Sequence, residues 1–323
     1  MKTCFTCKVL RPLSMLLAFI VCVIAISIAL VWESDRSVES LTARWAPPPS
    51  RFILLDGLSA HVRDEGARDD PRPIVLLHGT SASLHTWDGW TAELVKSRRV
   101  IRVDLPGFGL TGPAPENDYR IQRYVRFVTA LYDHFQITQS VLAGNSLGGG
   151  IAWQCALALP QRVSQLILVD AAGYPMTSQS IPIAFRLARI PAIAPVVINV
   201  LPRGLVEASV KSVYGDPNKV TPELVDRYFE LALRTGNRAA LMERFRQTVW
   251  GEGRERIQRI SQPTLILWGG KDRLIPSENG ARFKRDIAGS ELVEFDALGH
   301  VPHEEDPRAT LVPVRRFLGA TGA

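Results

Sequence analysis

Residues 141–153 read V-L-A-G-N-S-L-G-G-G-I-A-W, and this stretch decides the fold. An apolar run ends in a Gly-x-Ser-x-Gly pattern formed by Gly144, Ser146 and Gly148, and a helix-compatible run follows it. A serine at the tip of such a turn has a strained backbone, and side chains two positions away on either side would clash with it. The pattern therefore predicts a sharp strand-to-helix turn that lifts the Ser146 hydroxyl clear of the backbone, as a nucleophile requires. The alternative is a glycine-rich turn that only packs.

A serine is a poor nucleophile at neutral pH and needs a base. His300, in A-L-G-H-V-P, follows the last predicted strand and is the candidate base. The imidazole needs a carboxylate that fixes its tautomer, and Asp272, in W-G-G-K-D-R, closes the preceding strand. Asp170 also closes a strand and is left open as the alternative acid. The chain order Ser146, Asp272, His300 is the order of triads built on such a turn.

The oxyanion formed during acyl transfer needs two hydrogen-bond donors. One candidate is the backbone N–H of Leu147, at the start of the predicted helix, whose N-terminus favours negative charge. The other is the N–H of Thr80, in the stretch H-G-T-S-A-S that follows the predicted strand 74–77. Gly79 would let the backbone approach, with His78 in support. The alternative for this pair is an ordinary turn.

Short apolar runs alternate with helical patterns along most of the chain. Strands are predicted at 51–55, 59–63, 74–77, 100–103, 140–143, 165–169, 264–268 and 291–295, and helices at 87–96, 121–135, 147–159, 277–287 and 307–318. This alternation predicts an α/β fold with a mostly parallel, eight-stranded sheet and helices on both faces. Residues 51–173 and 254–323 would form the core. Residues 174–253 contain no clear strand and would form a helical cap over the carboxyl edge of the sheet, where active sites of such sheets lie.

The N-terminal region differs from the rest. Residues 13–32 contain no charged residue, which predicts a transmembrane anchor. Basic residues in 1–12 and acidic residues after the apolar run place the N-terminus in the cytoplasm and the catalytic domain on the exterior or periplasmic side. A cleaved signal peptide is the main alternative, but no small-x-small site closes the segment. Residues 33–50 end in a proline run and are interpreted as a linker.

Composition limits the remaining possibilities. Charged residues make up 22% of the chain and the net charge is +6, with the basic residues scattered. A nucleic-acid groove would require clustered Lys and Arg, so a solvated basic surface is expected and no nucleic-acid partner. Cys155 is the only cysteine after the anchor, which excludes a disulfide framework. No metal-ligand cluster is apparent, and neither a metal nor an organic cofactor is expected.

The motifs together resemble those of the α/β-hydrolase superfamily across 51–318. They are H-G at 78–79, D-L-P-G-F-G at 104–109, G-N-S-L-G at 144–148, W-G-G-K-D at 268–272 and G-H at 299–300. The resemblance implies a capped serine hydrolase similar to esterases, monoacylglycerol-lipase-like enzymes and the carbon–carbon-bond hydrolases of aromatic ring-cleavage pathways. Haloalkane dehalogenases and epoxide hydrolases carry an aspartate where Ser146 stands. The elbow with Asn145 occurs in the carbon–carbon hydrolases.

Three functions follow from this resemblance and the anchor. The leading expectation is a membrane-anchored hydrolase of carboxylic esters with an apolar acyl or lipid-like part, acting through an acyl-enzyme on Ser146. The second is a carbon–carbon-bond hydrolase of a vinylogous diketone acid, which would require a cation facing the carboxylate, such as Arg186 or Arg189 in the cap. The third is a silent binding protein on this scaffold, marked by a missing triad member, and none is missing. The substrate is expected to be a small molecule, and protein partners are not indicated.

Overall fold

The computed structural model describes residues 15–16, 18–23, 31–175, 190 and 198–320. Within them the strands are β1 (Arg51–Leu55), β2 (Leu58–Gly66), β3 (Ile74–Leu77), β4 (Arg99–Val103), β5 (Ser140–Asn145), β6 (Val163–Val169), β7 (Thr264–Gly269) and β8 (Glu291–Phe295). The α-helices that bear on the argument are α2 (Val38–Trp45), α3 (Asp88–Leu94), α4 (Ile121–His134), α5 (Leu147–Ala158), α8 (Arg203–Val213), α9 (Pro222–Ala232), α10 (Asn237–Gln247), α11 (Glu278–Asp286), α12 (Pro302–Glu305) and α13 (Pro307–Ala320).

The eight strands form one sheet in the order β1-β2-β4-β3-β5-β6-β7-β8. β2 pairs antiparallel with both β1 and β4, and every other neighbouring pair is parallel. The predicted eight-stranded, mostly parallel sheet is therefore confirmed. Parallel strands place their carboxyl ends on one edge, and β5, β7 and β8 bring the segments that follow them to that edge.

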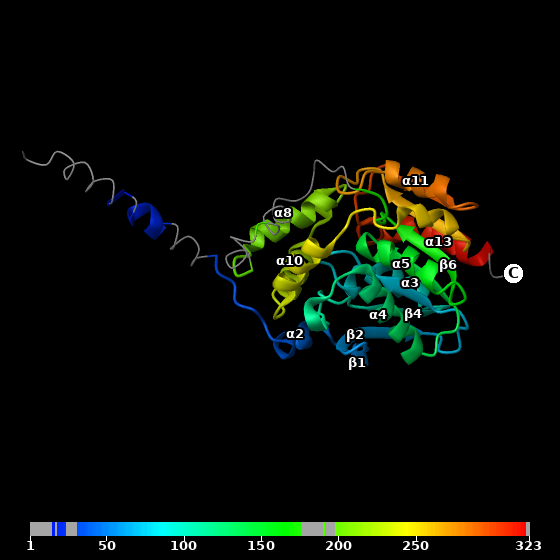
Figure 1. Cartoon of the computed structure of the whole chain (residues 1–323), viewed down its shortest axis with the longest axis horizontal. Coiled ribbons are helices and arrows are strands. Elements are labelled where there is room, and N and C mark those ends of the chain that lie inside the picture. The colour runs from blue at the N-terminus through cyan, green and yellow to red at the C-terminus, as the bar shows by residue number, and fades with distance from the viewer. Residues whose placement is uncertain (1–14, 17, 24–30, 176–189, 191–197, 321–323) are drawn as a thin grey trace, which may run out of the picture.

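Helices cover both faces of the sheet, which explains why the central strands are continuous apolar runs. Every residue of β3, β5 and β7 is buried. On one face α4, α5 and α11 contribute to a core that includes Phe127, Ile151 and Phe283. On the other, α3 and α13 pack through Trp90 and Val314. The order of the layers can be followed in Figure 1.

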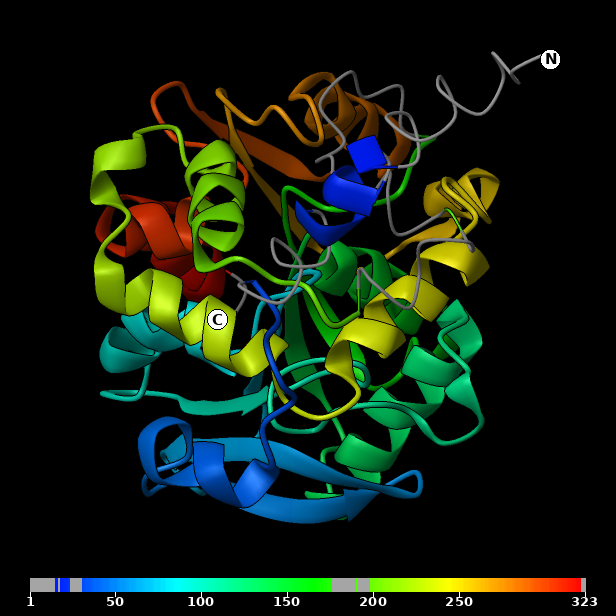
Figure 2. The same ribbon diagram turned by 90° about the vertical axis from the view of Figure 1, so that its left-hand side faces the viewer.

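The described residues between β6 and β7 include three α-helices. α8, α9 and α10 lie there, and the lime and yellow ribbons of Figure 2 stand in front of the central strands. His300 N–H donates to the carbonyl of Val213, at the end of α8, at 2.7 Å. This bond ties the cap directly to the loop after β8.

Half of the predicted anchor, 13–32, lies outside the described residues. Within the described residues, no helix combines the length and apolarity needed to cross a membrane. The interpretation of 33–50 as a linker needs correction, because Val38–Trp45 forms helix α2. Leu41 is buried in a cluster with Leu110 and Leu231, and Trp45 Nε1 donates to Glu230 at 2.6 Å. Two interactions stabilise this helix. The Ser37 side chain accepts from the Ser40 N–H at the N-terminus of the helix, and Leu41 packs against Leu231 of α9.

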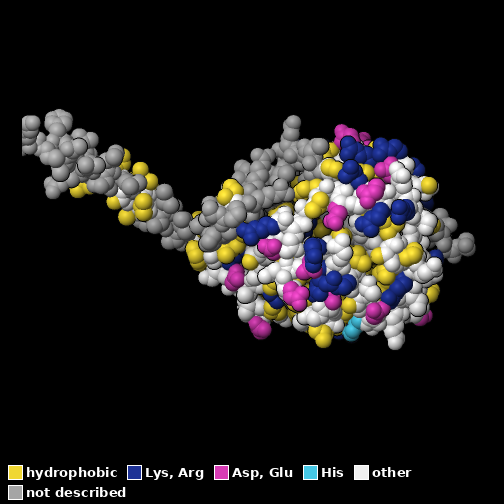
Figure 3. Space-filling model, viewed as in Figure 1, with side chains coloured by type: hydrophobic (Ala, Val, Ile, Leu, Met, Phe, Trp, Pro, Cys, Tyr) yellow, Lys and Arg dark blue, Asp and Glu magenta, His cyan; other side chains and the backbone are white. Residues whose placement is uncertain are grey.

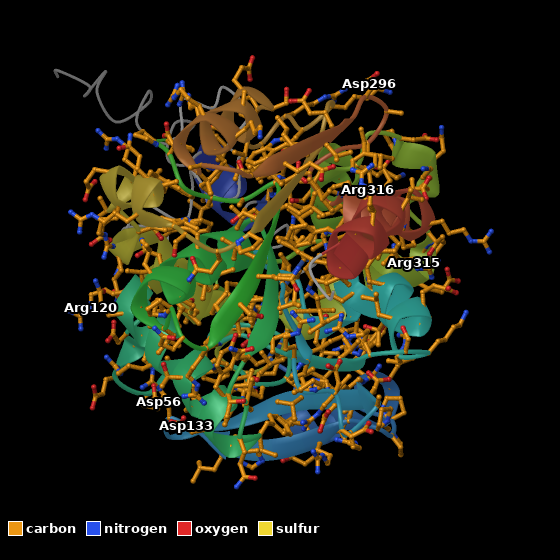
Figure 4. The ribbon with its side chains drawn as sticks, turned by 90° about the vertical axis from the view of Figure 1, so that its right-hand side faces the viewer. Asp56, Arg120, Asp133, Asp296, Arg315 and Arg316 are labelled. Atoms are coloured by element: carbon orange, nitrogen blue, oxygen red, sulfur yellow. The ribbon has the colours of Figure 1, made fainter. Side chains whose placement is uncertain are left out.

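Charged side chains lie mainly at the surface. Among the residues labelled in Figure 4, Arg120, Asp133, Arg315 and Arg316 are exposed at the surface. On the face shown in Figure 3, basic and acidic side chains are interspersed. This arrangement fits the expectation of a solvated basic surface.

Candidate active site

Ser146 lies at the turn between β5 and α5 in a backbone conformation that side chains rarely adopt. Its φ is 54° and its ψ is −114°. A Cβ added to Gly144 would lie 2.2 Å from the carbonyl oxygen of Gly148, and one added to Gly148 would lie 2.2 Å from the carbonyl oxygen of Leu77. Both contacts are with backbone that cannot move aside. The elbow therefore folds as the sequence predicts, because only glycine fits at these two positions.

His300 and Asp272 meet at the carboxyl edge of the sheet. Asp272 follows β7 and His300 follows β8, and the distance from His300 Nδ1 to Asp272 Oδ2 is 2.6 Å. The other carboxylate oxygen of Asp272 accepts from the N–H groups of Leu274 at 2.7 Å and Ile275 at 2.9 Å. Asp272 therefore has three hydrogen-bond partners, which fix the orientation of its carboxylate. Asp272, rather than Asp170, is the acid in contact with the imidazole.

A cavity of about 1050 Å³, partly open to solvent, lies beside the elbow and the His300 loop. Ser146 and His300 both line it, and so do Thr80 and Leu147. The remaining lining is mostly apolar and includes Val210, Val213, Phe245, Leu274 and Val301 from the cap and the core. Such a mainly apolar pocket with a few polar groups is typical of a small-molecule site.

The two candidate oxyanion donors lie on the same wall of this cavity. Leu147 is the first residue of α5, so its N–H has no partner within the helix. A Cβ at Gly79 would lie 2.8 Å from Asn145 Oδ1 and 3.2 Å from Ser146 Cβ, so glycine allows the Thr80 loop to approach the elbow. His78 fixes this loop, since its Nδ1 donates to the Gly79 carbonyl at 2.7 Å and its Nε2 accepts from the Leu105 N–H at 2.9 Å. Burial lowers the pKa of His78, which keeps it neutral in this role.

Asp170, the alternative acid predicted from the sequence, lies in the same cluster. Potential ligand atoms of Asp170, Asp272 and His300 lie within 4.8 Å of one another, the one group of described residues close enough to hold a metal ion. His300 Nδ1 and both carboxylate oxygens of Asp272 are already engaged in hydrogen bonds within the protein. Asp170 is fully buried, and its Oδ1 accepts from the Gly269 N–H at 3.0 Å. Burial, followed by the charge of Asp272, raises the pKa of Asp170 well above its ordinary value, which favours its protonated form.

Two further residues brace the site, and the sequence analysis did not identify their roles. Asn145 Nδ2 donates to the carbonyl of His300 at 3.0 Å and to that of Val169 at 3.2 Å. Glu305, in α12, accepts from the N–H of Gly299 at 2.8 Å and from that of Gly215 in the cap at 2.9 Å. The position of Asn145 beside the elbow serine was the available indication of its role, whereas the contacts of Glu305 depend on tertiary structure.

The other histidines lie outside the catalytic cavity. His61 is fully buried, and its Nδ1 is 2.8 Å from Asp104 Oδ2. Two strands of the antiparallel part bring this pair together across 43 residues, which no local pattern reveals. His85 lines a different cavity. His303 is buried against Trp87, with 4.0 Å between ring centroids, and is structural.

The cationic residues suggested for the cap, Arg186 and Arg189, lie outside the described residues. A different arginine reaches the cavity: Arg244, from α10, lines it together with Ser146 and His300. The sequence gives no indication that this arginine faces inward, because α10 carries arginines on several sides.

Comparisons with known proteins agree with this geometry. The family model described as "alpha/beta hydrolase fold" matches residues 72–307. The chain is 30% identical to the 2-hydroxy-6-oxo-2,4-heptadienoate hydrolase of Pseudomonas putida over 84% of this chain and 96% of that protein. A meta-cleavage product hydrolase of Pseudomonas fluorescens aligns with a TM-score of 0.74 at 23% identity, covering 84% of this chain and 98% of the other. A structure described as a membrane phospholipase A aligns with a TM-score of 0.73 at 23% identity, covering 98% and 99%. The chain therefore belongs to the alpha/beta hydrolase fold family and is a serine hydrolase of that fold.

Proposed function

We propose that this hydrolase cleaves a carbon–carbon bond beside the ketone of a vinylogous diketone acid. The similarity to the heptadienoate hydrolase carries the proposal, because it extends over 84% of this chain at 30% identity. The name of that relative describes an acid with a 6-oxo group on a conjugated chain. Ester hydrolysis is the leading expectation from the sequence, and the relatives support the alternative, carbon–carbon cleavage, more strongly.

In the proposed reaction, the Ser146 hydroxyl attacks the ketone carbon while His300 takes its proton. Asp272 holds the imidazole through Nδ1 and stabilises its positive charge. The N–H groups of Leu147 and Thr80 bind the oxyanion. The carbon–carbon bond breaks because the leaving carbanion is delocalised through the conjugated chain, and this carbanion takes the proton from His300. Water, deprotonated by His300, then releases the acid from the acyl-serine.

The second candidate is hydrolysis of a carboxylic ester with an apolar acyl part. A neighbouring cavity of about 770 Å³ favours it, because this cavity shares Ser81, Ala82, Ser209, Val210 and Tyr228 with the catalytic one. Together they offer a long apolar space for an acyl chain. In this candidate, residues 13–32 anchor the protein in a membrane and the catalytic domain lies on the exterior side. Fusing a reporter that is active only outside the cytoplasm to the C-terminus would test this orientation.

The test compares two substrates on the full-length protein in detergent. They are 2-hydroxy-6-oxohepta-2,4-dienoate, followed by loss of its absorbance, and p-nitrophenyl hexanoate. We expect kcat/KM for the dienoate to exceed that for the ester by at least about tenfold, and both activities to vanish in Ser146→Ala. Ser209→Ala, a second serine of the same cavity, is the matched control and should retain turnover. Turnover of the ester alone would contradict carbon–carbon cleavage and favour the second candidate.

A further inference from the structure

Arg244 has its charged group buried in the wall of the catalytic cavity. The residue is 4% exposed and lines the cavity beside Phe245. Its Nε and Nη1 atoms have no hydrogen-bond partner among the described residues. The polar group that acts on Arg244 is the Tyr124 hydroxyl, which itself donates to the carbonyl of Pro106 at 3.2 Å. Two guanidinium nitrogens therefore have no partner among the described residues.

The other buried arginines of the described residues each form an ion pair, whereas Arg244 does not. Arg102, Arg123 and Arg238 are each in an ion pair, with Asp88, Asp56 and Asp35 respectively. For Arg244 the described residues provide no ion pair. Arg244 lines two cavities: among the described residues the catalytic one has no Asp, Glu or Lys in its lining, and the neighbouring one includes Glu252. An unpaired buried charge is strongly destabilising. The exception therefore coincides with the catalytic cavity, where a substrate can complete the pair.

The donors around this position define the kind of ligand group that fits. Burial lowers the pKa of Arg244, but a guanidinium remains protonated in proteins and offers only donors. Trp250 lines the same cavity, and its Nε1, also a donor only, has no hydrogen-bond partner among the described residues. A ligand must therefore supply acceptors, and an oxyanion is the acceptor that a guanidinium binds most strongly.

We propose that Arg244 binds an anionic group, a carboxylate or a phosphate, at the end of the substrate away from the carbonyl that Ser146 attacks. This inference rests on the proposed function for the reaction itself. A carboxylate would correspond to the diketone acid, and a phosphate to the head group of a phospholipid. In both cases the anion fixes the substrate at one end, and the apolar lining holds the chain between.

Binding to the full-length Ser146→Ala protein tests the proposal without any turnover. The probes are p-nitrophenyl hydrogen adipate, p-nitrophenyl 6-phosphonooxyhexanoate and the neutral p-nitrophenyl hexanoate, compared by isothermal titration calorimetry. We expect at least one anionic ester to bind at least about tenfold more tightly than the neutral one. Adding Arg244→Gln should weaken that ester by at least about 30-fold and leave the neutral one unchanged. Arg246→Gln, on the same helix and 45% exposed, is the matched control and should change neither.

The two anionic probes separate the sources of the charge, since preference for the carboxylate supports an acid substrate and preference for the phosphate supports a phospholipid. Equal affinity of all three esters would overturn the proposal. Arg244→Met distinguishes binding from folding, because replacing an unpaired buried charge by an apolar side chain should leave Tm unchanged or raise it. A lower Tm with an unchanged affinity ratio would make Arg244 structural. If anion preference holds and the wild type turns over no substrate, the proposed function fails and the binding site stands.

Discussion

Asn145 joins the nucleophile elbow to the loop that carries His300. Its Nδ2 donates to the His300 carbonyl at 3.0 Å, although 155 residues separate the two positions. The same amide reaches the end of β6 through the Val169 carbonyl at 3.2 Å. One side chain therefore sets the distance between the residue before the proposed nucleophile and the backbone of the proposed base.

Asn145→Ala should lower kcat by about 10- to 100-fold, because a small displacement of the base relative to the nucleophile has large effects on rate. KM should change little, since the amide contacts backbone and not the apolar walls of the cavity. Steady-state kinetics on the better substrate checks this. Asn218→Ala, an exposed asparagine in the cap, is the control, and equal kcat for both variants would show that the Asn145 bridge is dispensable.

Asp170→Asn should change how stability depends on pH. Burial and the charge of Asp272 raise the pKa of Asp170 in the folded protein, above an unfolded value of about 3.9. A raised pKa favours folding fully below the unfolded value, and this contribution is lost as pH rises toward the folded value, by up to about 1.4 kcal/mol per pH unit. Asparagine has a similar shape and is neutral at every pH.

The free energy of unfolding of Asp170→Asn, measured in urea over a range of pH, should therefore rise relative to that of the wild type as the pH increases above about 4. Asp133→Asn, at a side chain 64% exposed, should show no such trend. A constant difference between Asp170→Asn and the wild type over this range would mean that Asp170 is ionised in the folded protein.

Gly148→Ala should destabilise the fold by about 1–3 kcal/mol or more, as overpacking does. The added methyl group would lie 2.2 Å from the Leu77 carbonyl oxygen, which belongs to β3. Gly204 provides the matched control, because it lies in α8 and nothing is within 4 Å of a Cβ built there. Gly204→Ala should stabilise the protein by about 0.5–1 kcal/mol. Similar Tm values for the two variants would contradict the steric account of the elbow.

Patterns that depend on local physics predicted most of the fold. The apolar run 74–77 coincides with β3, since a strand covered on both faces must be continuously apolar. The glycines around Ser146 specified the turn because the steric requirement acts within five residues. The predicted strand 291–295 also coincides with β8, which precedes the loop that contains His300.

Features that depend on contacts between distant segments were not predictable. His61 pairs with Asp104 across neighbouring strands, and a histidine in a short strand does not show in sequence which face it occupies. Helix α2 is stabilised by packing against Leu110 and Leu231. Because these contacts come from distant parts of the chain, residues 33–50 were interpreted from sequence as a linker. The inward orientation of Arg244 depends on how α10 rests on the sheet. Substrate class also stayed open, because esters and vinylogous ketones require the same nucleophile, base and oxyanion donors.

The most direct test of the central claim is covalent labelling of the full-length protein with a fluorophosphonate, followed by mass spectrometry. The reagent reports an activated serine whatever the natural substrate is. The account predicts one adduct, located on Ser146, absent from Ser146→Ala and formed far more slowly in His300→Ala. An adduct on another residue, or none on the folded wild-type protein, would contradict the assignment of Ser146 as the nucleophile.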